Sequence, residues 1–369
     1  MSMLHLQFGN GSEISLKIAP LGIIPLIVAI VSPLLCYAEE PSTNTKNPAN
    51  RLSNNPPGSP PNSSDFNVFA GLIVWTAKEA GSDCWAEVIT SNGSASSNTL
   101  RQVDFGWDPG FRIGAGYRLS HDHWDTQAYY THFQTIGKDH VSNGPGTVHS
   151  AFLGNFYVNN PNGSGLSGPS YQKASIDWTI HFNMLDWELG RNFLVSKSLA
   201  LRPFLGLKGG SIAQSMHTEW QNPDLSGAAF FNLGRENLKN NFWGIGPEVG
   251  INTRWRLCAR EYQSFHLFGD FSGALMWGHW SFGDLFKNDI GDRVSIHLKN
   301  IKSGASMARA YMGFEWDANF HQNRYQFSTK LGYEMQFWLD QLQFYSFTGG
   351  RLTNALTLQG GTLEFCFNF

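Results

Sequence analysis

Residues 243–257 read WGIGPEVGINTRWRL, and two kinds of side chain alternate along them. Trp243 and Trp255 fall on an apolar side with isoleucine, valine and leucine, whereas Glu248 and Arg254 fall on the other side. A period of two predicts a β-strand with two different faces. Such a strand fits a soluble sandwich or a membrane barrel, and the rest of the chain distinguishes the two.

The composition suits a protein in which about every second residue is apolar. The chain has 369 residues, of which 15% are charged, 14% are aromatic and 39 are glycine. Ordinary globular chains have about 25% charged residues. The mean hydropathy is negative, which excludes a bundle of membrane helices. The net charge of −3 argues against a nucleic-acid partner, because such proteins usually present a basic patch.

An export signal is predicted at the start of the chain. Residues 18–35 (IAPLGIIPLIVAIVSPLL) are apolar, follow a lysine and precede small residues. This pattern predicts a signal peptide over residues 1–38, cleaved after Ala38. Three prolines in the run argue against a permanent membrane helix. A lipoprotein signal at Cys36 is the alternative, and the bulky Leu35 disfavours it.

The exported chain is predicted to contain a linker and one domain. Residues 39–64 are rich in proline, asparagine and serine and have almost no apolar side chains. Such a segment buries too little surface to order itself, so we expect a disordered linker. The composition changes at Asp65 and then stays uniform to the end of the chain, which predicts a single domain over residues 65–369.

Ten segments of this domain alternate with a period of two. They are 66–78, 104–119, 124–137, 173–190, 199–219, 238–257, 265–281, 306–320, 325–340 and 356–369. Their connections are alternately long and short, and the long ones are 79–103, 138–172, 220–237, 282–305 and 341–355. An even number of strands with short periplasmic turns and long outer loops is typical of an outer-membrane barrel.

We therefore predict an all-β fold: a transmembrane antiparallel up-and-down β-barrel of about 10 strands (range 8–12) in the bacterial outer membrane. A soluble β-protein would not need strands of about 15 residues. A tilted strand crosses the membrane with about 9–11 residues, so the strands should project on the outer side. Six aromatic residues should face lipid: Trp243, Trp255, Phe314, Trp316, Phe327 and Phe337. Segment 174–190 changes phase between Met184 and Leu185, which predicts a β-bulge there.

The polar faces should line the lumen. The candidates are Arg112, Arg118, Asp177, Arg202, Lys208, Glu248, Arg254, Arg256, Asp270, Arg309, Glu315, Asp317, Lys330, Glu334 and Glu364, together with Asp186 and Glu188. The two signs nearly balance, which predicts salt bridges and weak selectivity, since a lining of one sign would favour ion selectivity. Side chains fill barrels of about 8 strands, and open porins have 16–18. A narrow pore and a filled structural or adhesive barrel are therefore both open alternatives.

The last segment, TLEFCFNF (362–369), places Phe365, Phe367 and Phe369 on one face. This pattern resembles the signal that the outer-membrane assembly machinery reads, so that machinery is an expected partner. The usual signal has a glycine five positions before the final aromatic residue, where this chain has Glu364.

No enzymatic site is expected. The strongest candidate is HDHWD, which places His121 and His123 beside Asp122 and Asp125. It falls in a short periplasmic turn, and two histidines need further ligands to hold a metal. An outer-membrane hydrolase is therefore a remote alternative, and we expect no catalytic residue, cofactor or metal. The exported chain has three cysteines, Cys84, Cys258 and Cys366, an odd number without metal-site spacing.

The long segment 138–172 contains the apolar stretch AFLGNFY (151–157). Three alternatives exist for this stretch: it folds into the lumen as a constriction, packs on the rim, or contacts a host surface.

Besides the assembly machinery, outer-membrane lipid is an expected partner of the barrel.

Three stretches carry a family resemblance: GWDPGFRIGAGY (106–117), HWDTQAYYTHF (123–133) and RPFLGLKGG (202–210). On these residues the chain resembles the Legionella-type pore-forming major outer-membrane proteins and, more loosely, the chlamydial major outer-membrane porins. The resemblance extends over most of 65–369. It implies an outer-membrane β-barrel with pore activity in bacteria that live inside eukaryotic cells, and it brings no catalytic motif.

Overall fold

The computed structural model describes residues 3–7, 13–17, 66–79, 84–92, 95–119, 122–144, 147–151, 169–224, 231–260, 262–320, 325–346 and 350–369. The chain divides into two compact units, Met1–Leu52 and Ser53–Phe369. In the first, β1 (Met3–Gln7) and β2 (Glu13–Lys17) form an antiparallel hairpin. None of the described residues belongs to a helix long and apolar enough to cross a membrane. The predicted linker and most of the predicted signal peptide lie outside the described residues, so cleavage after Ala38 stays a prediction.

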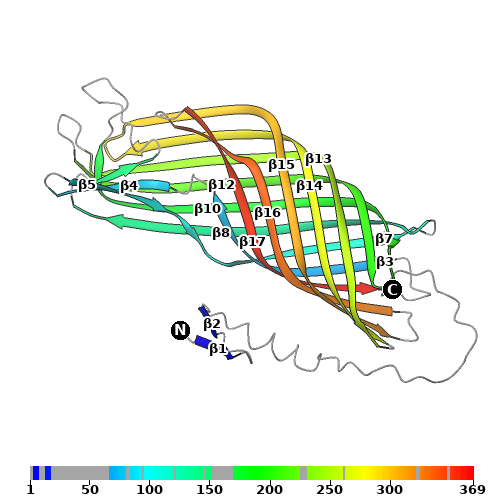
Figure 1. Ribbon diagram of the computed structural model, residues 1–369. Helices are drawn as coiled ribbons and strands as arrows, with labels where there is room; N and C mark the ends of the chain where they lie inside the picture. Colours follow the sequence, from blue (N-terminus) through cyan, green and yellow to red (C-terminus); the bar gives the residue numbers. More distant parts are fainter. Residues whose placement is uncertain are drawn as a thin grey trace, which may run out of the picture. The chain divides into compact units, whose positions relative to one another are not determined.

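The described part of the second unit consists of strands and short connections (Figure 1). The strands are β3 (Phe66–Glu79), β4 (Cys84–Asn92), β5 (Ala95–Gln102), β6 (Asp104–Phe105), β7 (Asp108–Arg118), β8 (Trp124–Ser142), β9 (Val148–Ser150), β10 (Ser170–Arg191), β11 (Phe193–Leu194), β12 (Leu199–Asp224), β13 (Leu233–Ala259), β14 (Gln263–Asn288), β15 (Arg293–Phe320), β16 (Tyr325–Ser346) and β17 (Gly350–Asn368).

Ten of these strands form a closed antiparallel ring. Its order is β3, β7, β8, β10, β12, β13, β14, β15, β16 and β17, so ring neighbours follow one another along the chain. The ring closes where β17 pairs with β3, for example at Leu363 and Leu72. Within the part of the ring that would lie in lipid, closure pairs every strand on both sides, which is what a strand structure in lipid requires. The ten-strand up-and-down barrel is thereby confirmed.

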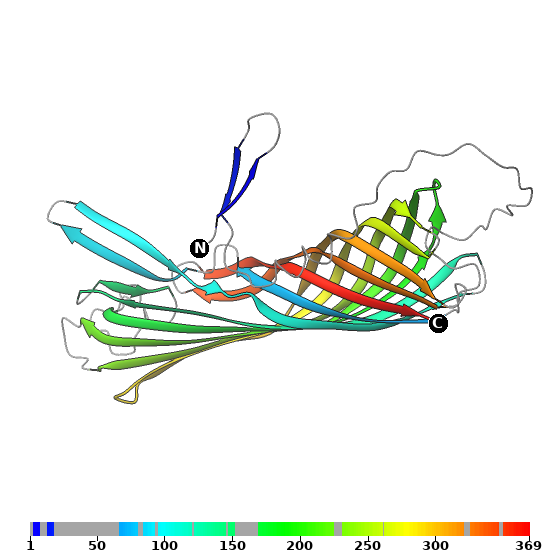
Figure 2. The same ribbon diagram turned by 90° about the horizontal axis from the view of Figure 1, so that it is seen from below.

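The strands extend further at one end than the sequence predicted. Strands β12 to β15 have 26, 27, 26 and 28 residues. Residues 282–305, predicted as a loop, are the ends of β14 and β15 around the turn 289–292. Residues 79–103 likewise contain the hairpin of β4 and β5. In Figure 2, β12–β15 continue beyond the ends of β3, β16 and β17. The prediction missed this outer extension because its apolar residues, such as Val294 and Ile296, face inward.

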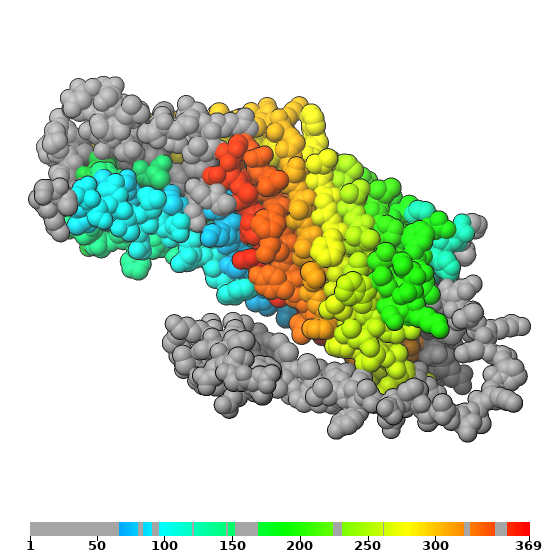
Figure 3. Space-filling model, in the orientation of Figure 1, coloured from blue at the N-terminus to red at the C-terminus, as the bar shows by residue number. Residues whose placement is uncertain are grey.

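Exposed apolar side chains surround the half of the ring that has the short turns. They include Leu72, Phe111, Ile113, Leu185, Trp187, Leu205, Leu207, Trp243, Ile245, Val249, Trp255, Phe271, Leu275, Trp277, Met312, Phe314, Tyr333, Phe337, Phe365 and Phe367. Trp316 and Phe327 are half-buried and pack edge to face, 6.3 Å between ring centroids. Figure 3 shows β12–β17 as a continuous outer wall. An apolar surface of this size fits contact with lipid.

An arginine on this band should be costly. The Phe314→Arg variant is expected to lose about 2–4 kcal/mol of unfolding free energy, because the charge enters the hydrocarbon region. Urea unfolding of the protein in lipid vesicles measures the loss. His297→Arg is the matched control, because His297 is an exposed residue on the outer extension of the same strand. Equal stability of Phe314→Arg and wild type would contradict the assignment of the lipid face.

The β-bulge predicted between Met184 and Leu185 is wrong. β10 pairs with β8 and β12 in one unbroken register through this point. From Ala174 to Gly190 the residues with even numbers face inward, including Phe182 and Met184 above the junction and Asp186 below it. The change of phase therefore marks a change in the interior, from apolar in the outer half to charged in the periplasmic half.

Candidate functional site in the barrel interior

A cluster of charged side chains crosses the periplasmic half of the barrel around one carboxylate. Glu334 on β16 accepts two hydrogen bonds from Arg112 on β7, at 3.0 and 2.8 Å. It accepts a third, at 2.7 Å, from Nε of Arg309 on β15. The side chains of Arg112 and Glu334 are only 2% and 0% exposed. Arg309 also donates to the hydroxyl of Tyr129 on β8, 3.0 Å away. One buried carboxylate thus binds two guanidinium groups from different strands.

Three further cations each lie between two carboxylates. These trios are Arg202 with Asp125 (2.6 Å) and Glu188 (2.7 Å), Lys208 with Asp186 and Glu248 (3.7 Å), and Arg254 with Glu315 (2.7 Å) and Asp317. Burying a charge is costly unless a partner of opposite sign compensates it. The pairing explains how one barrel holds so many charged groups, and it ties strands together across the interior.

A cavity of about 270 Å³ lies among these charges. Its lining runs from residues at the short-turn rim, such as Asn67 and Asn368, to the deeper Arg112, Arg309 and Tyr311. Because short turns mark the periplasmic side, the cavity is a periplasmic vestibule. Water and small polar solutes fit such a lining.

The vestibule brings together most of the predicted lumen residues. Eleven of them line it: Arg112, Arg118, Glu188, Arg202, Arg254, Asp270, Arg309, Glu315, Asp317, Lys330 and Glu364. Lys208, Glu248 and Glu334 are buried in the ion pairs beside it. Arg256 is half-buried and is not among its lining residues.

Asp177 is a correction to the predicted lining. Its side chain is 56% exposed on the outer surface, where it pairs with Lys138 at 3.3 Å. Asp177 and Asp186 differ by an odd number of positions, so an unbroken strand places them on opposite faces. Only the predicted bulge would have turned both inward.

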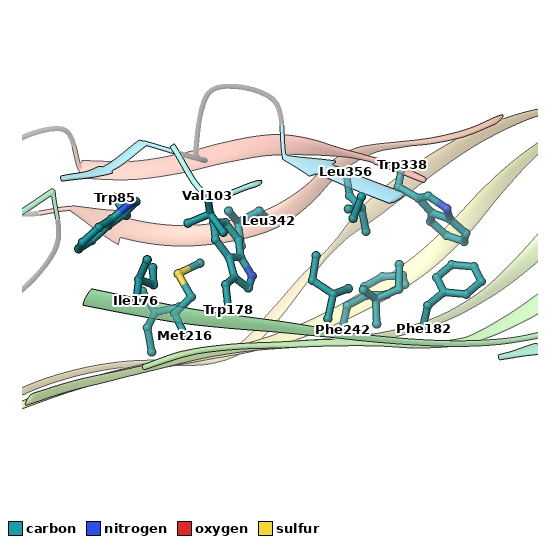
Figure 4. Close-up of a cluster of buried hydrophobic side chains, with 14 of the residues drawn as sticks. Trp85, Val103, Ile176, Trp178, Phe182, Met216, Phe242, Trp338, Leu342 and Leu356 are labelled. Carbon is teal, nitrogen blue, oxygen red and sulfur yellow. The ribbon is translucent and has the colours of Figure 1, made fainter. Parts of the chain in front are cut away.

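The outer half of the interior is aromatic, and the sequence prediction missed this layer. Trp75 lies 5.6 Å from Phe133 and 6.5 Å from Phe182, and Phe182 lies 5.6 Å from Trp338, between ring centroids. These rings come from β3, β8, β10 and β16. Figure 4 shows side chains from opposite walls filling the space between them. We call this cluster the aromatic layer. The phase change after Met184 was the signal in the sequence that could have revealed it.

Hydrogen bonds join the aromatic layer to the charged cluster. Nε1 of Trp75 donates to Thr362 (3.1 Å), whose hydroxyl donates to Glu334 (3.2 Å). Nε1 of Trp338 donates to Gln336 (3.2 Å), whose amide also donates to Glu334 (3.0 Å). Two tryptophans of the layer are therefore held in place through the same carboxylate.

The described residues of the HDHWD segment are divided between the surface and the interior. Asp122 and His123 are exposed in a turn with positive φ angles of 55° and 59°. Asp125 points inward to Arg202. His121 lies outside the described residues. Within the described part of the chain, no three histidine, cysteine or acidic side chains gather as metal ligands.

The predicted assembly signal lies on the outer face of β17. Phe365 and Phe367 are exposed, and Phe369 packs edge to face on Phe66 with 5.2 Å between ring centroids. Glu364 faces the vestibule instead. Recognition by the assembly machinery stays a prediction.

Other predicted features fall partly outside the description. All of the stretch 151–157 except Ala151 lies outside the described residues, so its three alternatives remain untested. The cysteines that the structure describes, Cys84, Cys258 and Cys366, form no disulfide with one another.

Comparison with known proteins gives one family and several distant folds. The family described as Legionella pneumophila major outer membrane protein precursor matches residues 59–369. No curated protein matches the chain. One similar solved structure is the outer membrane protease OmpT from Escherichia coli (11% identity, TM-score 0.37, 83% of this chain and 97% of that one). Others are the P. putida toluene transporter TodX (10%, 0.29, 83% and 90%) and OprG from Pseudomonas aeruginosa (11%, 0.23, 84% and 97%). TM-scores this low support no inference about function.

Proposed function

We propose, for a chain that belongs to the Legionella major outer membrane protein family, a porin-like function: narrow and weakly selective passage of small solutes or ions across the bacterial outer membrane. The observation that carries the proposal is the charged vestibule of about 270 Å³ inside the closed ring. A barrel that serves only as a scaffold has no need for ionised groups around a hollow, since apolar packing would stabilise it at least as well.

The lining of the vestibule supports weak selectivity. Its basic residues are Arg112, Arg118, Arg202, Arg254, Arg309 and Lys330, and its acidic residues are Asp125, Glu188, Asp270, Glu315, Asp317 and Glu364. Six charges of each sign leave no net charge to exclude either kind of ion. These acidic and basic side chains, which together have no net charge, instead offer hydrogen-bonding groups that can replace part of a solute's hydration shell.

The aromatic layer makes the described state a closed one. Passage from the vestibule to the outside requires Phe182, Trp338 and their neighbours to move aside. A minor open conformation, populated at about 0.1–10%, is enough for intermittent conduction. We therefore infer a gated pore rather than a permanently open channel.

Single-channel recording in planar lipid bilayers tests this function. We expect brief openings of low conductance, with similar permeability for potassium and chloride. A barrel preparation that is folded, as judged by heat-modifiable migration on gels, and yet never conducts would contradict the proposal.

A second function, a structural or adhesive surface protein, has its own supporting observation. Strands β12–β15 continue far beyond the lipid-facing band, and their inner faces carry buried apolar residues there, so they can present a rigid surface outside the cell. Absence of conduction together with specific binding of the purified barrel to host cells would favour this candidate.

A further inference from the structure

Two carboxyl groups are buried in the outer extension, away from the vestibule. Glu236 on β13 and Asp284 on β14 are 2% and 1% exposed. Asp284 lies opposite Leu238 in the register, so the two acids are diagonal neighbours on one inner face. At the same level Lys239 and Lys287 are exposed on the outer face, which places the pair above the lipid-facing band.

The pair lies beneath aromatic rings and bonds to a third strand. Thr218 and Trp220 on β12 both donate to Oε2 of Glu236, each over 3.1 Å. The carboxyl of Asp284 hydrogen-bonds the carboxyl of Glu236. Phe231 and Phe286 pack edge to face nearby, with 6.2 Å between ring centroids. The pair therefore connects the outer ends of β12, β13 and β14.

Among the described residues, no basic side chain faces the pair. The neighbouring inner positions of β15 are Val294, Ile296 and Leu298, which are apolar. The inner positions of β12 are Thr218 and Trp220. Charged and titratable neighbours on the other face are His217, Glu219, Arg235, Lys239, Lys287, Arg293, His297 and Lys299. A further buried carboxyl of the outer extension is Glu79 on β3, which accepts a hydrogen bond from Gln214 (2.6 Å).

Two buried carboxyls that touch cannot both be ionised, since like charges repel and burial disfavours each charge. Burial first, and the neighbouring Glu236 second, raise the pKa of Asp284 to about 10. The pair therefore retains one shared proton at neutral pH, and that proton makes the hydrogen bond between the two groups.

We propose that Glu236 and Asp284 form a proton-binding latch, which holds the outer ends of β13 and β14 against β12 and opens as the pH rises. The latch goes beyond pore function, because it describes the stability of the outer extension whether or not the barrel conducts. Its ligand is the proton alone.

The direction of the pH effect follows from proton counting. When the outer extension opens and water enters, both carboxyls return to ordinary pKa values near 4. Between that pH and about 10 the closed form holds one proton more than the open form. The ratio of open to closed forms therefore rises about tenfold for each pH unit in this window. Closure is strongest in acid.

Amide hydrogen exchange at several pH values tests the latch in the full barrel, in detergent micelles or lipid nanodiscs. After correction for the intrinsic exchange rate, the protection factors of 234–240 and 282–288 should fall about a hundredfold between pH 6 and pH 8. In the double variant Glu236→Gln, Asp284→Asn they should not change with pH. Strand β16 within the lipid-facing band serves as the internal reference.

Glu219→Gln is the matched control, because Glu219 is a partly exposed acid on the neighbouring strand, paired with Arg235 at 2.8 Å. It should keep the pH response of wild type. Constant protection in wild type from pH 6 to pH 8 would overturn the proposal, even if the double variant fails to fold. An equal response in wild type and double variant would also overturn it. Neither outcome bears on conduction, so failure of the latch proposal can be told apart from failure of the proposed pore function.

Discussion

A Glu334→Leu variant is expected to lose about 3–5 kcal/mol of unfolding free energy, or to fail to fold, because it removes the carboxylate that pairs with two buried guanidinium groups. Glu334 accepts hydrogen bonds from Arg112 and Arg309 in the interior. It also accepts hydrogen bonds from Thr362 and Gln336, which in turn bind the tryptophans of the aromatic layer. The loss reflects the uncompensated charge of the arginines and not the net strength of the intact ion pair.

Equilibrium unfolding in urea, with the protein in lipid vesicles, measures this loss. The matched control is Asp177→Asn, which removes an acid from the exposed pair with Lys138. An exposed ion pair contributes about 0–1 kcal/mol, so this variant should unfold as wild type does. If Glu334→Leu were as stable as the control, the charged cluster would not brace the barrel.

A Trp338→Ala variant should lose about 3–5 kcal/mol and gain conductance. The indole is fully buried, and its removal leaves a cavity that the surrounding strands fill only in part. That cavity lies beside Phe182, in the aromatic layer that we propose closes the vestibule from the outside. The variant should therefore open more often in single-channel recordings, although it is less stable.

Trp316→Ala is the control for this effect. Trp316 is a tryptophan on the neighbouring strand, but its ring lies on the outer face against Phe327. Its removal should leave the open probability unchanged. Increased conductance in both variants would mean that general loosening of the barrel, and not the aromatic layer, controls passage.

Much of the fold could be predicted from alternation alone. The predicted segment 325–340, for example, begins where β16 begins, at Tyr325. A lipid-facing strand shows its apolar side outward, and that rule identified the ten crossings and their order. The rule does not recognise the same strand once it leaves the membrane, where apolar residues turn inward and polar residues face water. The outer extension was therefore predicted as loops.

The site was predictable only in its chemistry. The alternation of polar and apolar residues indicated that Arg112, Arg309 and Glu334 face the interior, since every second residue of a strand lies on the same face. Which of them meet depends on ring order, strand stagger and the length of each side chain, and one sequence does not specify these. The case of Asp177 shows how a wrong bulge changes the face of every residue beyond it.

Labelling of a single cysteine in the vestibule tests the central claim, a vestibule closed from outside by the aromatic layer. The protein would have Asn252→Cys in a background of Cys36→Ser, Cys84→Ser, Cys258→Ser and Cys366→Ser, since Asn252 lines the vestibule. A charged, membrane-impermeant thiol reagent should react readily from the periplasmic side. From the outer side it should react roughly 10- to 1000-fold more slowly, as expected for an open state populated at about 0.1–10%. Equal rates from both sides would contradict the account, because the path through the aromatic layer would then be open.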